Sequence, residues 1–329
     1  MTDNKPSFGE LLLSFPGLPD SAEQHLGVAP IDLKKAFSDN PLPLDFVLPG
    51  LLSGTVGVIV SPGGTGKSML MLESAIAVGI GEDFLGLWGQ TPHRGRVVYV
   101  AAEDPREVIE RRLHALGAHM GSEKMDAAAE LVEVLPMYGQ GFKIAEIAAK
   151  GGGITPSADW GALVKYLEAN PTRLLILDTF NRLLGGISEN DSGAMGAVLS
   201  IIEQACRKIG CAIVLVHHTN KASMNGGAAD QQAARGSSAI TDNARWQVNL
   251  SVMDRETAAL RGIEDDGERR QFVRLDLAKV NYGPPISERW LKRGPYGELM
   301  EGEPPAKIGK ENKASRKSRR DIDDDSIPY

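Results

Sequence analysis

The sequence predicts an α/β protein with a mostly parallel, twisted sheet flanked by helices and an antiparallel extension near the C-terminus. Three observations lead to this prediction. A glycine-rich turn at residues 61–66 separates an apolar run from an amphipathic run. Short apolar runs alternate with helix-like segments as far as residue 243, and this alternation then stops. Apolar strands of this kind are typical of parallel sheets that are covered by helices on both faces.

The predicted strands of the core are short and rich in valine, isoleucine and leucine. They are Val56–Val60, Val97–Ala101, Leu174–Leu177 and Ala212–Val216. Helical patterns follow the strands at Lys67–Val78, Pro105–Leu116, Trp160–Ala169 and Gly193–Ile209. Beyond residue 243 we expect three strands with no helices between them, extending the sheet through antiparallel pairing: Arg245–Met253, Gln271–Lys279 and Glu288–Lys292.

Composition divides the chain into three regions. Residues 1–30 show no sustained period and predict a flexible N-terminal arm. Residues 31–300 carry the folded domain, which starts with a short helix over Ile31–Phe37. Residues 301–329 combine a basic run with the acidic end DIDDDSIPY, which predicts a disordered charged tail.

Bulk composition excludes several classes of protein. With 329 residues, 42% of them hydrophobic, the chain can form one large domain, and it contains no apolar run of membrane-spanning length. We therefore expect no membrane association. The net charge of −7 argues against a protein that coats nucleic acid with a broad basic surface, although basic loops remain compatible with it. Cys206 and Cys211 lack metal or redox spacing, so we expect reduced thiols and a cytoplasmic protein.

The glycine-rich turn has the layout of a phosphate-binding P-loop. Strand, loop and helix follow one another in VGVIV-SPGGTGKS-MLML, and the loop residues Gly63, Gly64, Thr65 and Gly66 allow backbone N–H groups to face phosphate oxygens. Two adjacent side chains complete the predicted ATP and Mg²⁺ site: Lys67 for the phosphates and Ser68 for the metal ion. Ser61 stands where the general pattern has glycine.

Acidic residues follow two of the predicted strands. Asp178 ends the strand RLLILD, where it can hold Mg²⁺ together with Ser68. Glu103 follows VVYVAA and is our candidate for the base that orients the attacking water. Asp104 is a candidate nucleotide-binding residue, and with Pro105 it predicts a helix N-cap.

A histidine pair ends the strand AIVLV. His217 or His218 can sense the γ-phosphate, and we favour His217 because neighbouring strand residues face opposite ways. Long loops of small and polar residues follow this strand and the strand of Asp178. Three basic residues in these loops are candidates for contacts with a DNA backbone: Arg182, Lys221 and Arg235.

Several longer strings resemble one family. They are PLPLDFVLPGLLSGTVGVIVSPGGTGKSML, YVAAEDP, RRLHALGAHM, LLILDT, LVHHTNK, AADQQAARGSS, DNARWQ and KVNYG. In this order, over roughly residues 31–300, the chain closely resembles the RepA-type hexameric replicative DNA helicases of IncQ-like plasmids. The family shares the SPGG start of the loop.

The resemblance implies a RecA-like P-loop ATPase core, related more distantly to DnaB-type helicases. It also implies a ring-shaped homohexamer that moves 5′→3′ along single-stranded DNA using ATP, with ATP sites between subunits. Arg245, in DNARWQ, matches the family's arginine finger, which acts on the neighbouring subunit's site. A second finger is in doubt because Asn281 replaces the arginine that DnaB-type relatives carry two positions after Lys279.

Two further interpretations stay open at this stage. The chain can be a RecA-like DNA-dependent ATPase that does not unwind DNA, such as a recombination mediator or a regulatory ring. The tail resembles the acidic tip of bacterial single-stranded-DNA-binding proteins, and it can therefore recruit an initiator, primase or loader or simply increase solubility. A nucleotide kinase is disfavoured because no arginine-rich lid is present.

Overall fold

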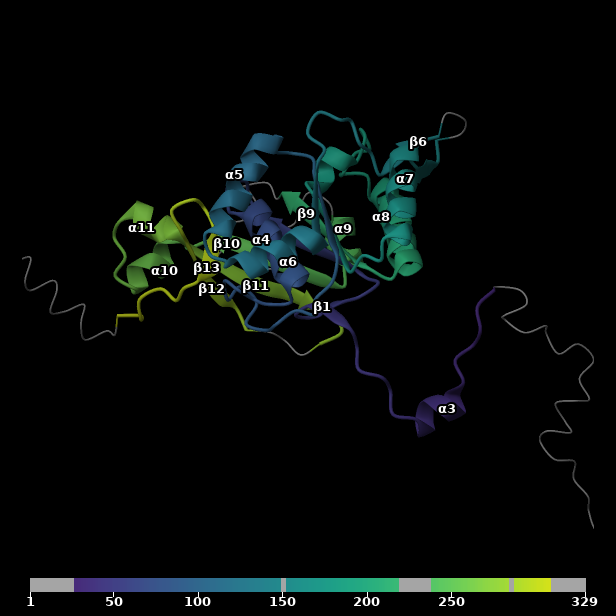
Figure 1. Cartoon of the computed structure of the whole chain (residues 1–329), viewed down its shortest axis with the longest axis horizontal. Coiled ribbons are helices and arrows are strands. Elements are labelled where there is room, and N and C mark those ends of the chain that lie inside the picture. Colours follow the sequence, from purple (N-terminus) through teal and green to yellow (C-terminus); the bar gives the residue numbers. More distant parts are fainter. Residues whose placement is uncertain (1–26, 149–151, 219–237, 284–286, 309–329) are drawn as a thin grey trace, which may run out of the picture. The chain divides into compact units, whose positions relative to one another are not determined.

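The computed structural model describes residues 27–148, 152–218, 238–283 and 287–308 (Figure 1). The chain divides into two units between Leu44 and Asp45. In the first unit, helix α3 (Leu33–Ser38) begins after Asp32, whose carboxylate accepts a hydrogen bond from the Lys35 amide at 3.0 Å. The helix predicted over Ile31–Phe37 is therefore present, and none of its residues is buried.

A nine-stranded sheet forms the centre of the second unit, in the order β13-β12-β11-β10-β3-β9-β8-β4-β5. The six strands from β10 to β5 are parallel: β10 (Trp246–Val252), β3 (Val56–Ser61), β9 (Ala212–His218), β8 (Leu174–Asp178), β4 (Val97–Ala101) and β5 (Val132–Pro136). The other three pair antiparallel: β11 (Phe272–Val280), β12 (Arg289–Arg293) and β13 (Leu299–Glu301).

Helices cover both faces of this sheet. Alternate residues of its strands point to opposite sides, so each face carries apolar side chains that pack against helices. One apolar cluster joins the sheet to α4 (Lys67–Ile80), α5 (Arg106–Gly117) and α6 (Ser122–Leu131). The other joins it to α7 (Ala158–Ala169), α8 (Ser192–Ile209) and the 3-10 turn η1 (Phe180–Leu183). In Figure 1, α4 and α6 lie near each other at the centre of the second unit, and α7 and α8 lie next to each other at its right.

Smaller elements complete the second unit. Two short antiparallel pairs are β1 (Phe46–Leu48) with β2 (Leu51–Leu52), and β6 (Ala145–Ile147) with β7 (Ile154–Pro156). Helix α9 (Ser238–Asn243) precedes β10, and Ile240 packs into the cluster that contains α8.

The C-terminal part differs from the prediction in two respects. Strand β10 runs parallel to β3, so the antiparallel extension begins only at β11. Two helices, α10 (Arg255–Leu260) and α11 (Asp266–Gln271), lie between β10 and β11, so the prediction of no helices there is wrong. Each has only six residues, too few to show a helical period, and each starts at an aspartate that accepts a backbone hydrogen bond.

Two composition-based expectations can be compared with the structure. Both cysteines are free and buried, and burial raises the pKa of each thiol. Within the residues described, no helix combines the length and apolarity that crossing a membrane requires. The arm over residues 1–26 and the tail over residues 309–329 lie outside the described residues.

Candidate nucleotide-binding site

The turn after β3 has a backbone that only glycine adopts readily. Gly64 has φ +77° and Gly66 has φ +112°, a region that L side chains disfavour. Gly66 is the N-cap of α4, so the first amide groups of the helix are without intrahelical acceptors. The Thr65 hydroxyl donates to the Pro62 carbonyl at 2.9 Å and closes the turn. This geometry provides an anion site at a helix N-terminus.

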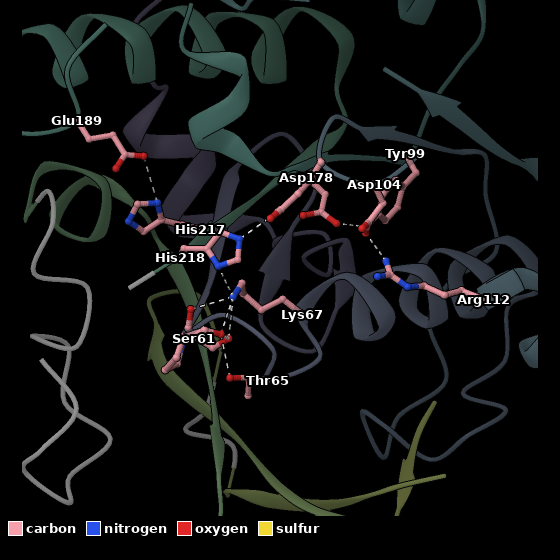
Figure 2. A network of polar contacts seen from close by, with 12 residues as sticks. Ser61, Thr65, Lys67, Tyr99, Asp104, Arg112, Asp178, Glu189, His217 and His218 are labelled. Atoms are coloured by element: carbon pink, nitrogen blue, oxygen red, sulfur yellow. Dashed lines mark hydrogen bonds and ion pairs between the residues drawn. The ribbon is translucent and has the colours of Figure 1, made fainter. Parts of the chain in front are cut away.

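Lys67 turns back into the loop (Figure 2). Its ammonium lies 2.8 Å from the Ser61 carbonyl, 3.0 Å from the Ser61 hydroxyl and 3.0 Å from His218 Nδ1. Burial lowers the pKa of Lys67 to about 8, against the opposing effect of the nearby Asp178 and Glu103. Ser61 therefore has a role that the general pattern's glycine could not supply, because its hydroxyl accepts from the lysine.

His218 connects Lys67 to Glu103. An ammonium group only donates, so His218 Nδ1 must accept, and the ring proton then lies on Nε2. Nε2 is 3.1 Å from Glu103 Oε2 and donates to it. The result is a hydrogen-bonded chain from the loop lysine to the candidate base.

His217 lies away from this chain. It is buried, and its Nδ1 is 3.6 Å from Glu189 Oε1, too long for a hydrogen bond. Burial lowers its pKa to about 4, so the ring is neutral at neutral pH. The two histidine side chains face opposite sides of the strand, as expected. However, it is His218, and not the favoured His217, that contacts Lys67.

Asp178 ends β8 and is almost completely buried. Its Oδ2 accepts a hydrogen bond from the Tyr99 hydroxyl, while its Oδ1 has no partner among the described residues. Burial raises the pKa of Asp178, and the hydrogen bond from Tyr99 and the nearby Ser68 hydroxyl act in the opposite direction. An unpartnered buried carboxylate oxygen beside the Ser68 hydroxyl fits a Mg²⁺ ion, which prefers oxygen ligands.

Asp104 does not cap α5. Pro105 is the N-cap residue and makes no side-chain cap hydrogen bond. The Asp104 carboxylate instead accepts from Arg112, two turns along the helix, at 2.6 Å. The prediction that Asp104 caps the helix is therefore wrong. The physical reason is that a charged guanidinium is a stronger partner for a carboxylate than a backbone amide is.

Several of these groups line one cavity of about 340 Å³, whereas Ser61, Asp178 and His217 are not among its lining residues. Its lining residues are Gly64, Gly66, Lys67, Ser68, Met69, Glu103, Asp104, Arg112, His218, Arg293, Tyr296 and Gly297. Five of them were not predicted from the sequence: Met69, Arg112, Arg293, Tyr296 and Gly297. The only signal for the last three was RGPYG, which follows the predicted strand Glu288–Lys292 and reads as a turn, but it did not indicate where the turn would lie.

Arg293 holds the β12–β13 turn against the loop. Its guanidinium donates to the Thr65 carbonyl at 2.7 Å. Nearby, the Leu299 amide donates to Oε1 of the buried Glu73 carboxyl group of α4 at 2.6 Å. The last strands of the sheet therefore support the loop and the helix that follows it.

The remaining predicted residues lie elsewhere. Arg245 is exposed and precedes β10, at the opposite end of the sheet from the loop, because β10 and β3 are parallel. Arg182 is exposed on η1, just after Asp178. Lys221 and Arg235 lie outside the described residues.

Comparison with known proteins agrees with this architecture. A solved "ATPase Domain" matches with a TM-score of 0.54 at 13% sequence identity, over 87% of this chain and 100% of that one. The "Crystal structure of the RadB recombinase" matches with a TM-score of 0.48 at 12% identity, over 76% of this chain and 92% of that one. The prediction of a RecA-like P-loop ATPase fold is confirmed. The family described as "AAA domain" matches residues 26–224. Since this match covers more than half of the chain, the protein belongs to the AAA domain family.

Proposed function

We propose that the protein is an ATP-dependent 5′→3′ replicative DNA helicase for a plasmid or other mobile element. It acts in the cytoplasm as a homohexameric ring on single-stranded DNA. The observation that carries the proposal is the hydrogen-bonded chain from Lys67 through His218 to Glu103 around a single cavity. The family-specific strings supply the argument for a motor that acts on DNA.

Three polar side chains around the cavity have proposed roles. Lys67 leaves its loop carbonyls and binds the β- and γ-phosphates, together with the amide groups of residues 63–68. Glu103 orients the attacking water and accepts its proton. When Lys67 moves, His218 loses one of its two partners, so this histidine is placed to sense the phosphate.

Ser68 and Asp178 would hold Mg²⁺. The ion supplies positive charge beside the phosphates. The chain's own contribution is a buried carboxylate, Asp178, whose free oxygen already lies at the carboxyl end of β8.

Assembly and DNA contacts complete the proposal. Arg245 cannot reach its own loop, so it serves as an arginine finger for a neighbouring subunit. Arg182, Lys221 and Arg235 contact the phosphates of single-stranded DNA, which makes binding strongly salt-dependent. The folded domain spans residues 31–300, residues 1–30 form a flexible arm, and the tail over residues 301–329 recruits an initiator, primase or loader.

An unwinding assay tests the proposal directly. A duplex with a 5′ single-stranded tail is incubated with ATP and Mg²⁺ at low salt, with the wild type and with Lys67→Ala. We expect strand separation by the wild type only, and none on a 3′-tailed duplex. If DNA stimulates ATP hydrolysis but no strand separation occurs, the protein is a DNA-dependent ATPase that does not unwind DNA, and not a helicase. If the wild-type protein does not hydrolyse ATP, the whole proposal is overturned.

A further inference from the structure

Tyr99 is a buried residue whose hydroxyl reaches the proposed metal site. It lies in the middle of β4, is 1% exposed, and packs its ring into the apolar cluster on the α4 side of the sheet. Its hydroxyl donates to Asp178 Oδ2 and lies 3.4 Å from the Ser68 carbonyl. Figure 2 shows Tyr99 close to Asp178, away from Lys67 and the two histidines.

Packing alone does not account for this hydroxyl. A phenylalanine would fill the same apolar space without placing a polar group in the core, and a buried hydroxyl without a partner is unfavourable. The hydroxyl is satisfied here because Asp178, the proposed metal ligand, accepts from it. The two residues come from adjacent parallel strands, and Asp178 pairs with Ala101, two residues after Tyr99.

The two oxygens of Asp178 are in different states as a result. Oδ2 is occupied by Tyr99, whereas Oδ1 has no partner among the described residues. A carboxylate that is held at one oxygen cannot rotate freely about its last side-chain bond. Its other oxygen is therefore fixed in direction before any ion arrives.

We propose that Tyr99 is a positioning residue, whose hydroxyl holds Asp178 so that Oδ1 is presented to the divalent cation that accompanies the nucleotide. This inference rests on the proposed function, since it concerns the same site. Hydrogen bonds to a metal ligand commonly change metal affinity by about 10–100-fold. Among the described residues, the hydrogen bonds of Lys67 are to Ser61, Pro62 and His218 and not to Tyr99, so we expect nucleotide binding without metal to change little when the Tyr99 hydroxyl is removed.

The test compares Tyr99→Phe with Tyr166→Phe. Tyr166 is a matched control because its hydroxyl also donates to a carboxylate, Glu133, at 2.5 Å, on an edge strand far from the loop. Binding of a fluorescent ATP analogue is measured in EDTA and across a Mg²⁺ titration. For Tyr99→Phe we expect affinity in EDTA within about twofold of the wild type and a Mg²⁺ half-saturation about 10-fold higher. Tyr166→Phe should match the wild type in both measurements.

A double-mutant cycle shows whether Tyr99 acts through Asp178. In an Asp178→Asn background, Tyr99→Phe should shift the Mg²⁺ half-saturation by less than about twofold, since the partner carboxylate is gone. An unchanged Mg²⁺ dependence in Tyr99→Phe, or an equal shift in both backgrounds, would overturn the inference. A general loss of nucleotide affinity in EDTA would also overturn it, because that result indicates a structural role.

The outcome separates this inference from the proposed function. A wild type that binds and hydrolyses ATP while Tyr99→Phe retains normal Mg²⁺ dependence refutes only the role of Tyr99. A wild type that binds no nucleotide refutes the proposed function itself.

Discussion

Glu73 is a carboxyl group in an environment that favours its neutral form. It is fully buried on α4, where one oxygen accepts from the Leu299 amide and the other, Oε2, has no partner among the described residues. Burial raises its pKa from the ordinary value of 4.5 to about 8, and the neighbouring Arg293 opposes this only in part. The group is therefore largely protonated at neutral pH.

The raised pKa makes stability dependent on pH. The folded protein keeps a proton that the unfolded chain has already released, so stability falls as the pH rises from about 4.5 to about 8. Glu73→Gln retains an oxygen for the Leu299 amide and cannot ionise. We therefore compare the free energy of unfolding of this variant with that of the wild type. We expect the difference to shift in favour of the variant by on the order of 4 kcal/mol as the pH rises from about 5 to about 8.5.

Urea unfolding at both pH values measures this difference. Glu110→Gln, on the exposed face of α5, is the control and should follow the wild type at each pH. A stability difference between Glu73→Gln and the wild type that stays constant with pH would contradict the raised pKa.

Single residues of the site were predictable where the chain places them together. Gly63 to Ser68 are contiguous, so the loop could be identified from one short string. Glu103 and Asp178 could be inferred because they end strands, and parallel strands end at one edge. Arg112 and Arg293 were missed, since their positions depend on a helix turn and on distant strands. The choice between His217 and His218 could not be settled by alternation alone, because alternation does not say which face contains the lysine.

At the scale of single elements, β3 depends on a glycine that the loop motif does not include. A Cβ atom at Gly57 would lie 2.6 Å from the ring of Trp246 and 2.9 Å from Leu51 Cδ1. Trp246 is fully buried and its indole N–H donates to the Pro49 carbonyl at 2.8 Å, so the ring has no room to move. The neighbouring strand β10 therefore requires the smallest side chain at this position.

Two glycine-to-alanine variants should change stability in opposite directions. Gly57→Ala forces atoms into a packed core, and we expect a loss of about 1–3 kcal/mol. Gly161→Ala, inside α7, meets no atom within 4 Å and should gain up to about 1 kcal/mol through helix propensity. Chemical denaturation followed by circular dichroism measures both. A neutral Gly57→Ala would mean that β10 can shift away from β3.

The secondary-structure elements also differ in how far their sequences predict them. Core strands and long helices were located within a few residues, because each carries a long apolar pattern. Helices α6, α10 and α11 and the edge strands β5 and β13 were missed. Every residue of β5 is only half-buried. Its sequence, VEVLP, lacks the continuous apolar run that made the inner strands predictable.

At the scale of the whole molecule, the sheet separates Arg245 from the phosphate-binding loop. The loop and its acidic partners lie at the carboxyl ends of the parallel strands, while Arg245 precedes β10 at their amino ends. In the proposed ring, one subunit's Arg245 would serve another subunit's loop. Each ATP site would then require two chains.

Mixing inactive variants tests this arrangement. Lys67→Ala and Arg245→Ala should each lose at least about 100-fold in ATP turnover as pure proteins. Mixed one to one under conditions that allow subunit exchange, about a quarter of the sites would pair an intact loop with an intact arginine, and turnover should return in proportion.

The matched control replaces Arg245→Ala in the mixture by the double variant Lys67→Ala/Arg245→Ala. This mixture contains no intact loop and should stay inactive. A first mixture that also stays inactive, with mixed assemblies confirmed by mass spectrometry, would argue against Arg245 acting between subunits.

The contact between Arg293 and Thr65 has a consequence for biosynthesis. The two residues are separated by 228 positions, and the chain emerges from the ribosome starting at its amino end. At about 5–20 residues per second, the loop is made at least roughly ten seconds before the strand that supports it. A growing or truncated chain therefore has the complete phosphate-binding string but lacks the hairpin that anchors it. Nucleotide affinity should be acquired only when synthesis is nearly finished.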